Sequence, residues 1–206
     1  MKFKEKLEFK ILTSDTIKEW GQKYYGDWFV RLQSQENEPT TPGEKFFRYY
    51  TQGIDHVFNQ PLRDGCDIEK YFEYPSVFQA DMIYDAILEM NKQLAPENIV
   101  VYRYVDPKLL RSMMKWNDKK LLTKNTVIFD KGFLSTTLTQ ETVQSRDYTT
   151  IRNKVLKIYV PQGTPCIYLE LIADMNENEM LFPPMTKLKV LSNPFFSRYI
   201  ECIIEK

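Results

Sequence analysis

The chain has 206 residues, of which 43% are hydrophobic and 27% are charged, so it can bury a core and has the composition of a globular protein. Its 28 Lys and Arg balance its 28 Asp and Glu, which excludes the overall positive charge typical of nucleic-acid-binding proteins and predicts no nucleic-acid partner. With only 7 Gly, the sequence has neither a GxGxxG fingerprint nor a Walker phosphate-binding loop.

The histidine and cysteine content limits the chemistry further. His56 is the only histidine, which argues against Ser-His-Asp and Cys-His catalytic sites and against histidine-rich metal sites. Cys66, Cys166 and Cys202 are widely spaced, so we expect buried apolar residues, no disulfide framework and no metal site. Any acid–base chemistry must therefore come from carboxylates, Lys or Tyr.

The N-terminus predicts neither a signal peptide nor a membrane anchor. Charged residues interrupt the apolar ones in MKFKEKLEFKIL, which therefore lacks the apolar core of a signal peptide. No run of about 18 apolar residues occurs, so we expect no transmembrane helix and no membrane partner. We predict one soluble domain over residues 1–206, with residues 1–45 as a helical N-terminal extension, although the chain could equally be one domain of a larger protein.

Helices are expected in the first half of the chain. Apolar residues recur at helical spacing over residues 14–33. After a polar loop, Thr41 and Glu44 have the spacing of a capping box that starts a second helix, in which Gly53 indicates a break or close packing. Residues 59–65 (NQPLRDG) then resemble a turn region.

A third helix is expected after Ser76, which also has a capping-box pattern. The pattern then changes to β-branched and aromatic runs, of which the first, residues 99–105, is interrupted by Arg103. A short helix over 107–115 and a helix or loop over 140–151 separate further strands. The remaining strand candidates are 133–137, 155–160, 166–169, 179–182, 187–191 and 199–204. Helices first and strands later predict an α+β fold with an antiparallel or mixed sheet.

A pair of acidic residues precedes one of these strands. Glu177 and Glu179 lie two positions apart, directly before an apolar run. If residues 180–182 continue a strand that begins at Asn178, the two side chains share a face and project into one space. Unequal surroundings would push their pKa values apart, so that the two carboxylates could divide an acid–base task. On its own the pair is a weak signal, since a charged loop before an edge strand has the same pattern.

Three features occur in a fixed order along the chain: Tyr102-Arg103, the FLSTT stretch at 133–137, and Glu177 with Glu179. This order resembles the bacterial mono-ADP-ribosyltransferase toxins of the Arg-Ser-Glu class, and in particular the enzymatic components of the actin-modifying binary toxins. The resemblance implies the ADP-ribosyltransferase fold, in which N-terminal helices are followed by a mixed or antiparallel two-sheet β core.

The resemblance extends beyond these short motifs. Residues 50–63 are similar to the family's first-helix pattern, YTG followed by an Asn and Leu-Arg. Residues 160–169 are similar to its Val-Pro-Lys-Gly-Thr turn and the strand after it. Together the matching segments cover about residues 45–205, and their order is a stronger signal than any one of them.

The resemblance implies that NAD is the co-substrate and that no metal is needed. Arg103 would hold the pyrophosphate, because a guanidinium group pairs bidentately with phosphate oxygens. Arg152 matches a second phosphate-contacting arginine of the family. Asn59 and Arg63 match first-helix positions that contact the nucleotide in relatives, and Tyr102 belongs to the aromatic-Arg motif of the NAD site.

The same resemblance assigns the chemistry. Glu179 matches the family's invariant glutamate, which binds a hydroxyl of the nicotinamide ribose and stabilises an oxocarbenium-like cation. Ser135 would orient that carboxylate by a hydrogen bond. Glu177 matches the glutamate of the arginine-modifying branch, where a carboxylate orients an acceptor guanidinium whose own pKa lies above ~12. We therefore expect transfer of ADP-ribose to an arginine.

The partners that the resemblance implies are a target protein and, for binary toxins, a separate binding and translocation component. Thr137 stands where Ser is usual, which keeps the hydroxyl but adds bulk. Residues 172–176, the loop that meets the protein substrate in relatives, lack the Gly and Tyr common in actin-modifying toxins. The target is therefore actin or another host protein, reached in the host cytosol by a secreted or injected effector. Two alternatives remain: a catalytically silent adaptor copy of the fold, which the intact Arg103, Ser135 and glutamate pair disfavours, and an enzyme that mainly hydrolyses NAD.

Overall fold

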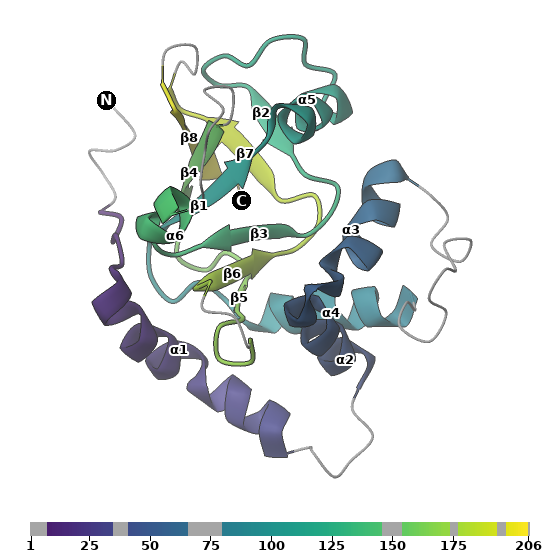
Figure 1. Ribbon diagram of the computed structural model, residues 1–206, viewed down its shortest axis with the longest axis vertical. Helices are drawn as coiled ribbons and strands as arrows, with labels where there is room; N and C mark the ends of the chain where they lie inside the picture. The colour runs from purple at the N-terminus through teal and green to yellow at the C-terminus, as the bar shows by residue number, and fades with distance from the viewer. Residues whose placement is uncertain are drawn as a thin grey trace.

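The structure is a computed structural model that describes residues 8–34, 41–65, 80–145, 154–173, 177–192 and 197–205. Its helices are α1 (Ser14–Ser34), α2 (Pro42–Tyr49), the π-helical turn η2 (Tyr50–Ile54), α3 (Asp55–Asp64), α4 (Ala80–Lys92), α5 (Pro107–Trp116) and α6 (Gln140–Ser145). Its strands are β1 (Ile99–Val105), β2 (Val127–Phe129), β3 (Leu134–Thr137), β4 (Lys154–Val160), β5 (Ile167–Tyr168), β6 (Glu179–Phe182), β7 (Lys187–Val190) and β8 (Tyr199–Ile204). Helices α1 to α4 lie below and beside the strands, and α5 lies at β2 (Figure 1).

The capping box predicted at the start of the second helix, formed by Thr41 and Glu44, is confirmed. The Thr41 hydroxyl accepts from the backbone N–H of Glu44 at 3.3 Å, and the Glu44 carboxylate accepts from the backbone N–H of Thr41 at 3.1 Å. Gly53 has φ 81°, a left-handed conformation that suits glycine, and it separates α2 from α3 as expected. The capping box predicted at Ser76 lies outside the described residues.

The turn predicted at residues 59–65 is wrong, because this segment is the second half of helix α3. Pro61 lies inside the helix, and the helix ends only at Gly65, which has φ 65°. Tertiary contacts hold the helix in place: the side chains of Asn59 and Arg63 bind the segment that leads into β3. These contacts outweigh the weak helix propensity of the Asn, Pro and Gly residues.

In the part of the chain that the structure describes, the strands form one mixed sheet of eight in the order β2-β7-β8-β4-β1-β3-β6-β5, where β4 and β8 are parallel and the other pairs antiparallel. This confirms the predicted α+β class with a mixed sheet. Within the described ranges, two groups of strands, β2-β7-β8-β4-β1 and β3-β6-β5, are joined through the single registered pair Tyr102–Thr137. The junction matters because the candidate functional residues meet there.

The helices pack on the sheet through an aromatic cluster. The Phe46 ring lies 4.6 Å from the rings of both Phe58 and Phe133, measured between centroids, and so joins α2, α3 and the entry to β3. Pairs of this kind contribute about 0.5–1.5 kcal/mol each beyond the area they bury. Cys166 and Cys202 are buried free thiols, as expected, whereas Cys66 is not among the described residues. No helix in the described ranges has the length and apolar character needed to cross a membrane.

Candidate active site

A cleft of about 260 Å³ lies where β1, β3 and β6 meet α3. Its lining includes seven residues that the sequence analysis singled out: Asn59, Arg63, Tyr102, Arg103, Ser135, Glu177 and Glu179. Arg152, the eighth, lies outside the described residues. The structure thus brings together side chains that are up to 120 positions apart in the chain, from Asn59 to Glu179.

Glu179 is the most perturbed carboxyl group in this cleft. It is the first residue of β6, paired with Thr137 of β3, and only 9% of it is exposed. Its pKa is raised to about 7, mainly by burial and in addition by the negative charges of Glu177 and Asp55, while a hydrogen bond from Ser135 and the charge of Arg103 oppose the shift. A carboxyl group of this kind exists in both protonation states near neutral pH.

Glu177 reaches the same cleft by a different route from the one predicted. Asn178 has φ 51°, a left-handed conformation, so Glu177 and Glu179 are not successive residues of one face of a strand. The end of β3 instead fixes this turn: the Thr137 hydroxyl donates to the Glu177 carbonyl at 2.8 Å, and the Leu138 N–H donates to the Asn178 carbonyl at 3.0 Å. The two carboxylates therefore converge through a turn, and Glu177 remains partly exposed whereas Glu179 is buried.

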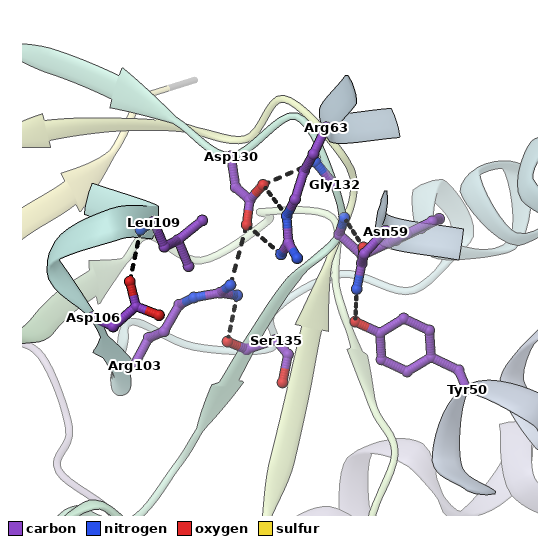
Figure 2. A network of polar contacts seen from close by, with 10 residues as sticks. Tyr50, Asn59, Arg63, Arg103, Asp106, Leu109, Asp130, Gly132 and Ser135 are labelled. Carbon is purple, nitrogen blue, oxygen red and sulfur yellow. Dashed lines mark hydrogen bonds and ion pairs between the residues drawn. The ribbon is translucent and has the colours of Figure 1, made fainter. Parts of the chain in front are cut away.

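Asp130, which the sequence analysis missed, organises the positive side of the cleft. Arg63 donates through Nε to Asp130 Oδ1 at 2.9 Å and through Nη2 to Oδ2 at 2.7 Å, and Arg103 Nη2 donates to Oδ2 at 3.1 Å. Figure 2 shows both guanidinium groups converging on this one carboxylate. Burial would raise the pKa of Asp130, but the hydrogen bonds from Arg63 and the positive charges of both arginines hold it below its ordinary value.

These contacts leave the arginines able to bind an anion. Each guanidinium group has five N–H donors. Arg63 uses two of them on Asp130, and Arg103 uses one on Asp130 and one on the Ser135 carbonyl at 2.9 Å. Because Arg103 comes from β1 and Arg63 from α3, the shared carboxylate fixes the spacing of two guanidinium groups from separate elements, an arrangement that suits a phosphate ligand.

The only sequence signal for Asp130 is that of a turn. Its Oδ1 also accepts from the backbone N–H of Gly132, two residues on, at 2.9 Å, as aspartates in turns commonly do. Nothing in that pattern reveals that arginines at positions 63 and 103 are its partners. Asp55, which also borders the cleft, was likewise not predicted.

Asn59 and Tyr102, both predicted to contact the nucleotide, are almost fully buried. Asn59 is 2% exposed; its Oδ1 accepts from the Phe133 N–H at 2.8 Å and its Nδ2 donates to the Tyr50 hydroxyl at 3.0 Å (Figure 2). Tyr102 is 1% exposed, and its side chain belongs to a cluster with Val100. Since neighbours along a strand point to opposite faces, this cluster lies across the sheet from the side chain of Arg103.

No group of three or more His, Cys, Asp or Glu within the described ranges is placed to hold a metal ion. What the cleft does combine is two arginines fixed on one aspartate, a buried Ser-Glu pair, and a second, more exposed glutamate. Such a set can bind a phosphorylated ligand and stabilise positive charge that develops beside it.

The sequence matches the model of the ADP-ribosyltransferase exoenzyme family over residues 17–199, and the chain belongs to this family. The predicted resemblance to bacterial ADP-ribosyltransferase toxins is thereby confirmed. No match was found among curated proteins.

Solved structures of bacterial ADP-ribosyltransferases share the fold. The chain is similar to an ADP-ribosyltransferase from Clostridium botulinum, with 18% identity over 97% of this chain and 100% of that one and a TM-score of 0.68. It is similar to BECa of a binary enterotoxin of C. perfringens, solved with NADH, with 18% identity over 96% of this chain and 50% of that one and a TM-score of 0.68. A third similar structure, from S. aureus and solved with NAD, has 18% identity over 97% of this chain and 99% of that one, with a TM-score of 0.65.

Proposed function

We propose that the protein is a mono-ADP-ribosyltransferase that uses NAD as co-substrate and transfers ADP-ribose to an arginine of a target protein. The observation that carries this proposal is the convergence of the Ser135–Glu179 pair, Glu177 and the two Asp130-bound arginines on one cleft. Family membership and the NAD-bound and NADH-bound structures of similar fold support it.

NAD suits a cleft that contains both signs of charge. Arg63 and Arg103 would bind the pyrophosphate through the N–H groups that Asp130 leaves unused. The nicotinamide ring of NAD is positively charged, and the carboxylates of the cleft favour it. The charge distribution thus orients the dinucleotide with its reactive bond near Glu179.

Glu179 and Ser135 would act on the ribose. As the bond between the nicotinamide nitrogen and the ribose C1′ breaks, nicotinamide leaves with the bonding electrons and the sugar develops positive charge. The Glu179 carboxylate would accept a hydrogen bond from a ribose hydroxyl and stabilise this charge at close range. The hydrogen bond from Ser135 holds the carboxylate in place and favours its ionised form.

Glu177 would serve the acceptor. A guanidinium group stays protonated at any accessible pH and is a poor nucleophile, so it needs a carboxylate that orients it and takes a proton as the new C1′–N bond forms. Glu177 has the exposure this role requires, since it is more accessible than Glu179 and borders the same cleft. We further propose a host protein as target, actin or another, for a secreted or injected effector.

The test is to incubate the protein with labelled NAD and host-cell lysate, and then to identify the modified residue by mass spectrometry. We expect ADP-ribose on an arginine of one or a few proteins. Label on asparagine, glutamine or cysteine would overturn the arginine assignment, and consumption of NAD without any labelled protein would favour an NAD-hydrolysing enzyme.

A further inference from the structure

Glu170, just after β5, binds the backbone of the stretch that carries the two glutamates of the cleft. Its Oε2 accepts from the backbone N–H of Asn178 at 2.6 Å and from that of Glu177 at 3.1 Å. The neighbouring residue adds a third tie, because the Leu169 N–H donates to the Glu179 carbonyl at 2.9 Å. The end of β5 therefore holds all three residues of the Glu-Asn-Glu stretch.

The backbone conformation of Asn178 explains why the hydrogen bonds to Glu170 are needed. A non-glycine residue with positive φ is held in a sparsely populated conformation, which asparagine tolerates better than most residues. In turns of this kind successive backbone N–H groups point the same way and form a small anion-binding hollow. The Glu170 carboxylate occupies that position, where hydrogen bonds to charged acceptors are stronger than those between neutral groups.

Burial adds to the significance of the contact. Glu170 is partly buried, and its desolvation raises its pKa, while the hydrogen bonds from the backbone of Asn178 and its neighbours oppose the rise. A carboxylate in this position loses hydration, so it remains only because these backbone donors replace water. Removing it would leave two backbone N–H groups without their acceptor.

We propose that Glu170 is a positioning residue, which holds the turn at Asn178 so that Glu177 and Glu179 both face the cleft. It does not border the cleft itself and would not touch NAD. The inference rests on the proposed function, since it concerns how the two proposed reactive carboxylates are placed. It predicts an effect on the rate of reaction and not on the binding of NAD, because the arginine network is separate from this turn.

The experiment compares Glu170→Ala, Glu170→Gln and the wild-type protein, with Glu19→Ala on the exposed face of α1 as control. NAD hydrolysis is measured over a range of NAD concentrations, and folding is followed by circular dichroism and thermal unfolding. We expect Glu170→Ala to lower kcat about 10- to 100-fold with KM for NAD nearly unchanged, because small misplacements of reacting groups have effects of this size. Glu170→Gln keeps a carbonyl acceptor and should restore part of the rate.

An unchanged kcat in Glu170→Ala would overturn the inference. A loss of rate that is fully explained by a loss of folded protein would also overturn it. The same holds if KM for NAD rises while kcat is retained. These outcomes leave the proposed function intact as long as the wild-type protein consumes NAD. A wild-type protein that leaves NAD intact would instead contradict the proposed function, and the inference with it.

Discussion

Burial of Glu179 gives its carboxyl group two consequences that belong together. The group is placed where it can stabilise a cationic sugar at short range, in surroundings that exclude water. The same surroundings disfavour its ionised form and raise its pKa to about 7. The ionised form of Glu179 that the proposed reaction needs is therefore the form that burial disfavours.

Replacement of Glu179 by Gln should reveal this in the pH dependence of stability. Folding raises the pKa of Glu179 to about 7, so the folded state binds a proton that the unfolded state has released between an ordinary carboxyl pKa and pH 7. The free energy of unfolding contributed by this group thus falls as pH rises through that window. Glutamine does not titrate, so we expect Glu179→Gln to gain stability relative to wild type as pH rises from about 4 to about 8.

Urea unfolding at several pH values across this window measures the difference directly. A stability difference between Glu179→Gln and wild type that stays constant with pH would show that the carboxyl pKa is not raised by folding. Wild type gaining on the variant at high pH would reverse the sign and contradict the burial argument.

The sequence predicted several of the residues that border the cleft, but not the residue that holds its arginines in place. Arg103, Ser135, Glu177 and Glu179 belong to an ordered motif set, and all four border one cleft. Asp130 was missed because a buried aspartate shared by two arginines arises from long-range contacts, and its local pattern is that of an ordinary turn.

Among the elements, the contact between α3 and the entry to β3 fixes the shape of the cleft. A Cβ atom at Gly132 would lie 2.6 Å from Asn59 Oδ1 and 3.3 Å from Arg63 Nε, so only glycine allows the two elements to approach this closely. Both neighbouring atoms are themselves fixed, Asn59 by Phe133 and Arg63 by Asp130.

The substitution Gly132→Ala should therefore lower stability and weaken NAD binding together. We expect a loss of about 1–3 kcal/mol, as found when a methyl group is forced into a packed site, because α3 and its arginine must move away. Gly26→Ala is the matched control: its Cβ would meet only the Gln22 side chain, at 2.6 Å, which can move. Alanine is the better helix former, so this control should gain up to about 1 kcal/mol.

Thermal unfolding and NAD titration of the two variants provide the measurement. Equal behaviour of Gly132→Ala and Gly26→Ala would show that close packing of α3 on the entry to β3 is not needed.

The sequence predicted most elements but failed where tertiary contacts override local preference. The capping box at Thr41 and the strands 99–105 and 179–182 follow from local patterns and are confirmed. The prediction for residues 59–65 was wrong because a helix with Pro61 inside is stabilised by distant partners. Strand β2 was not predicted, since three residues carry too little alternation to be recognised.

Over the whole molecule the positive and negative residues are equal in number, but in the cleft the two signs of charge are grouped separately. The positive charges of the cleft come from two arginines that bind Asp130, and the negative charges include those of Glu177 and Glu179. This cleft lies at the junction of the two strand groups, where Tyr102 pairs with Thr137. Segments of α3, β1, β3 and β6 must all be in place around this cleft, so the site forms only when the whole domain is folded.

The most direct test of the proposed reaction separates NAD cleavage from transfer. Wild type, Glu177→Gln, Glu179→Gln and the exposed control Glu19→Gln are each given labelled NAD, with and without host-cell lysate, and both NAD hydrolysis and protein labelling are measured. We expect Glu179→Gln to lose both activities by about 10²-fold or more, as when an electrostatic stabiliser is removed. Glu177→Gln should lose labelling by about 10²-fold, the size of a general-base effect, while hydrolysis stays within a few-fold of wild type. Full protein labelling by Glu177→Gln, or retained hydrolysis by Glu179→Gln, would contradict the division of labour between the two glutamates.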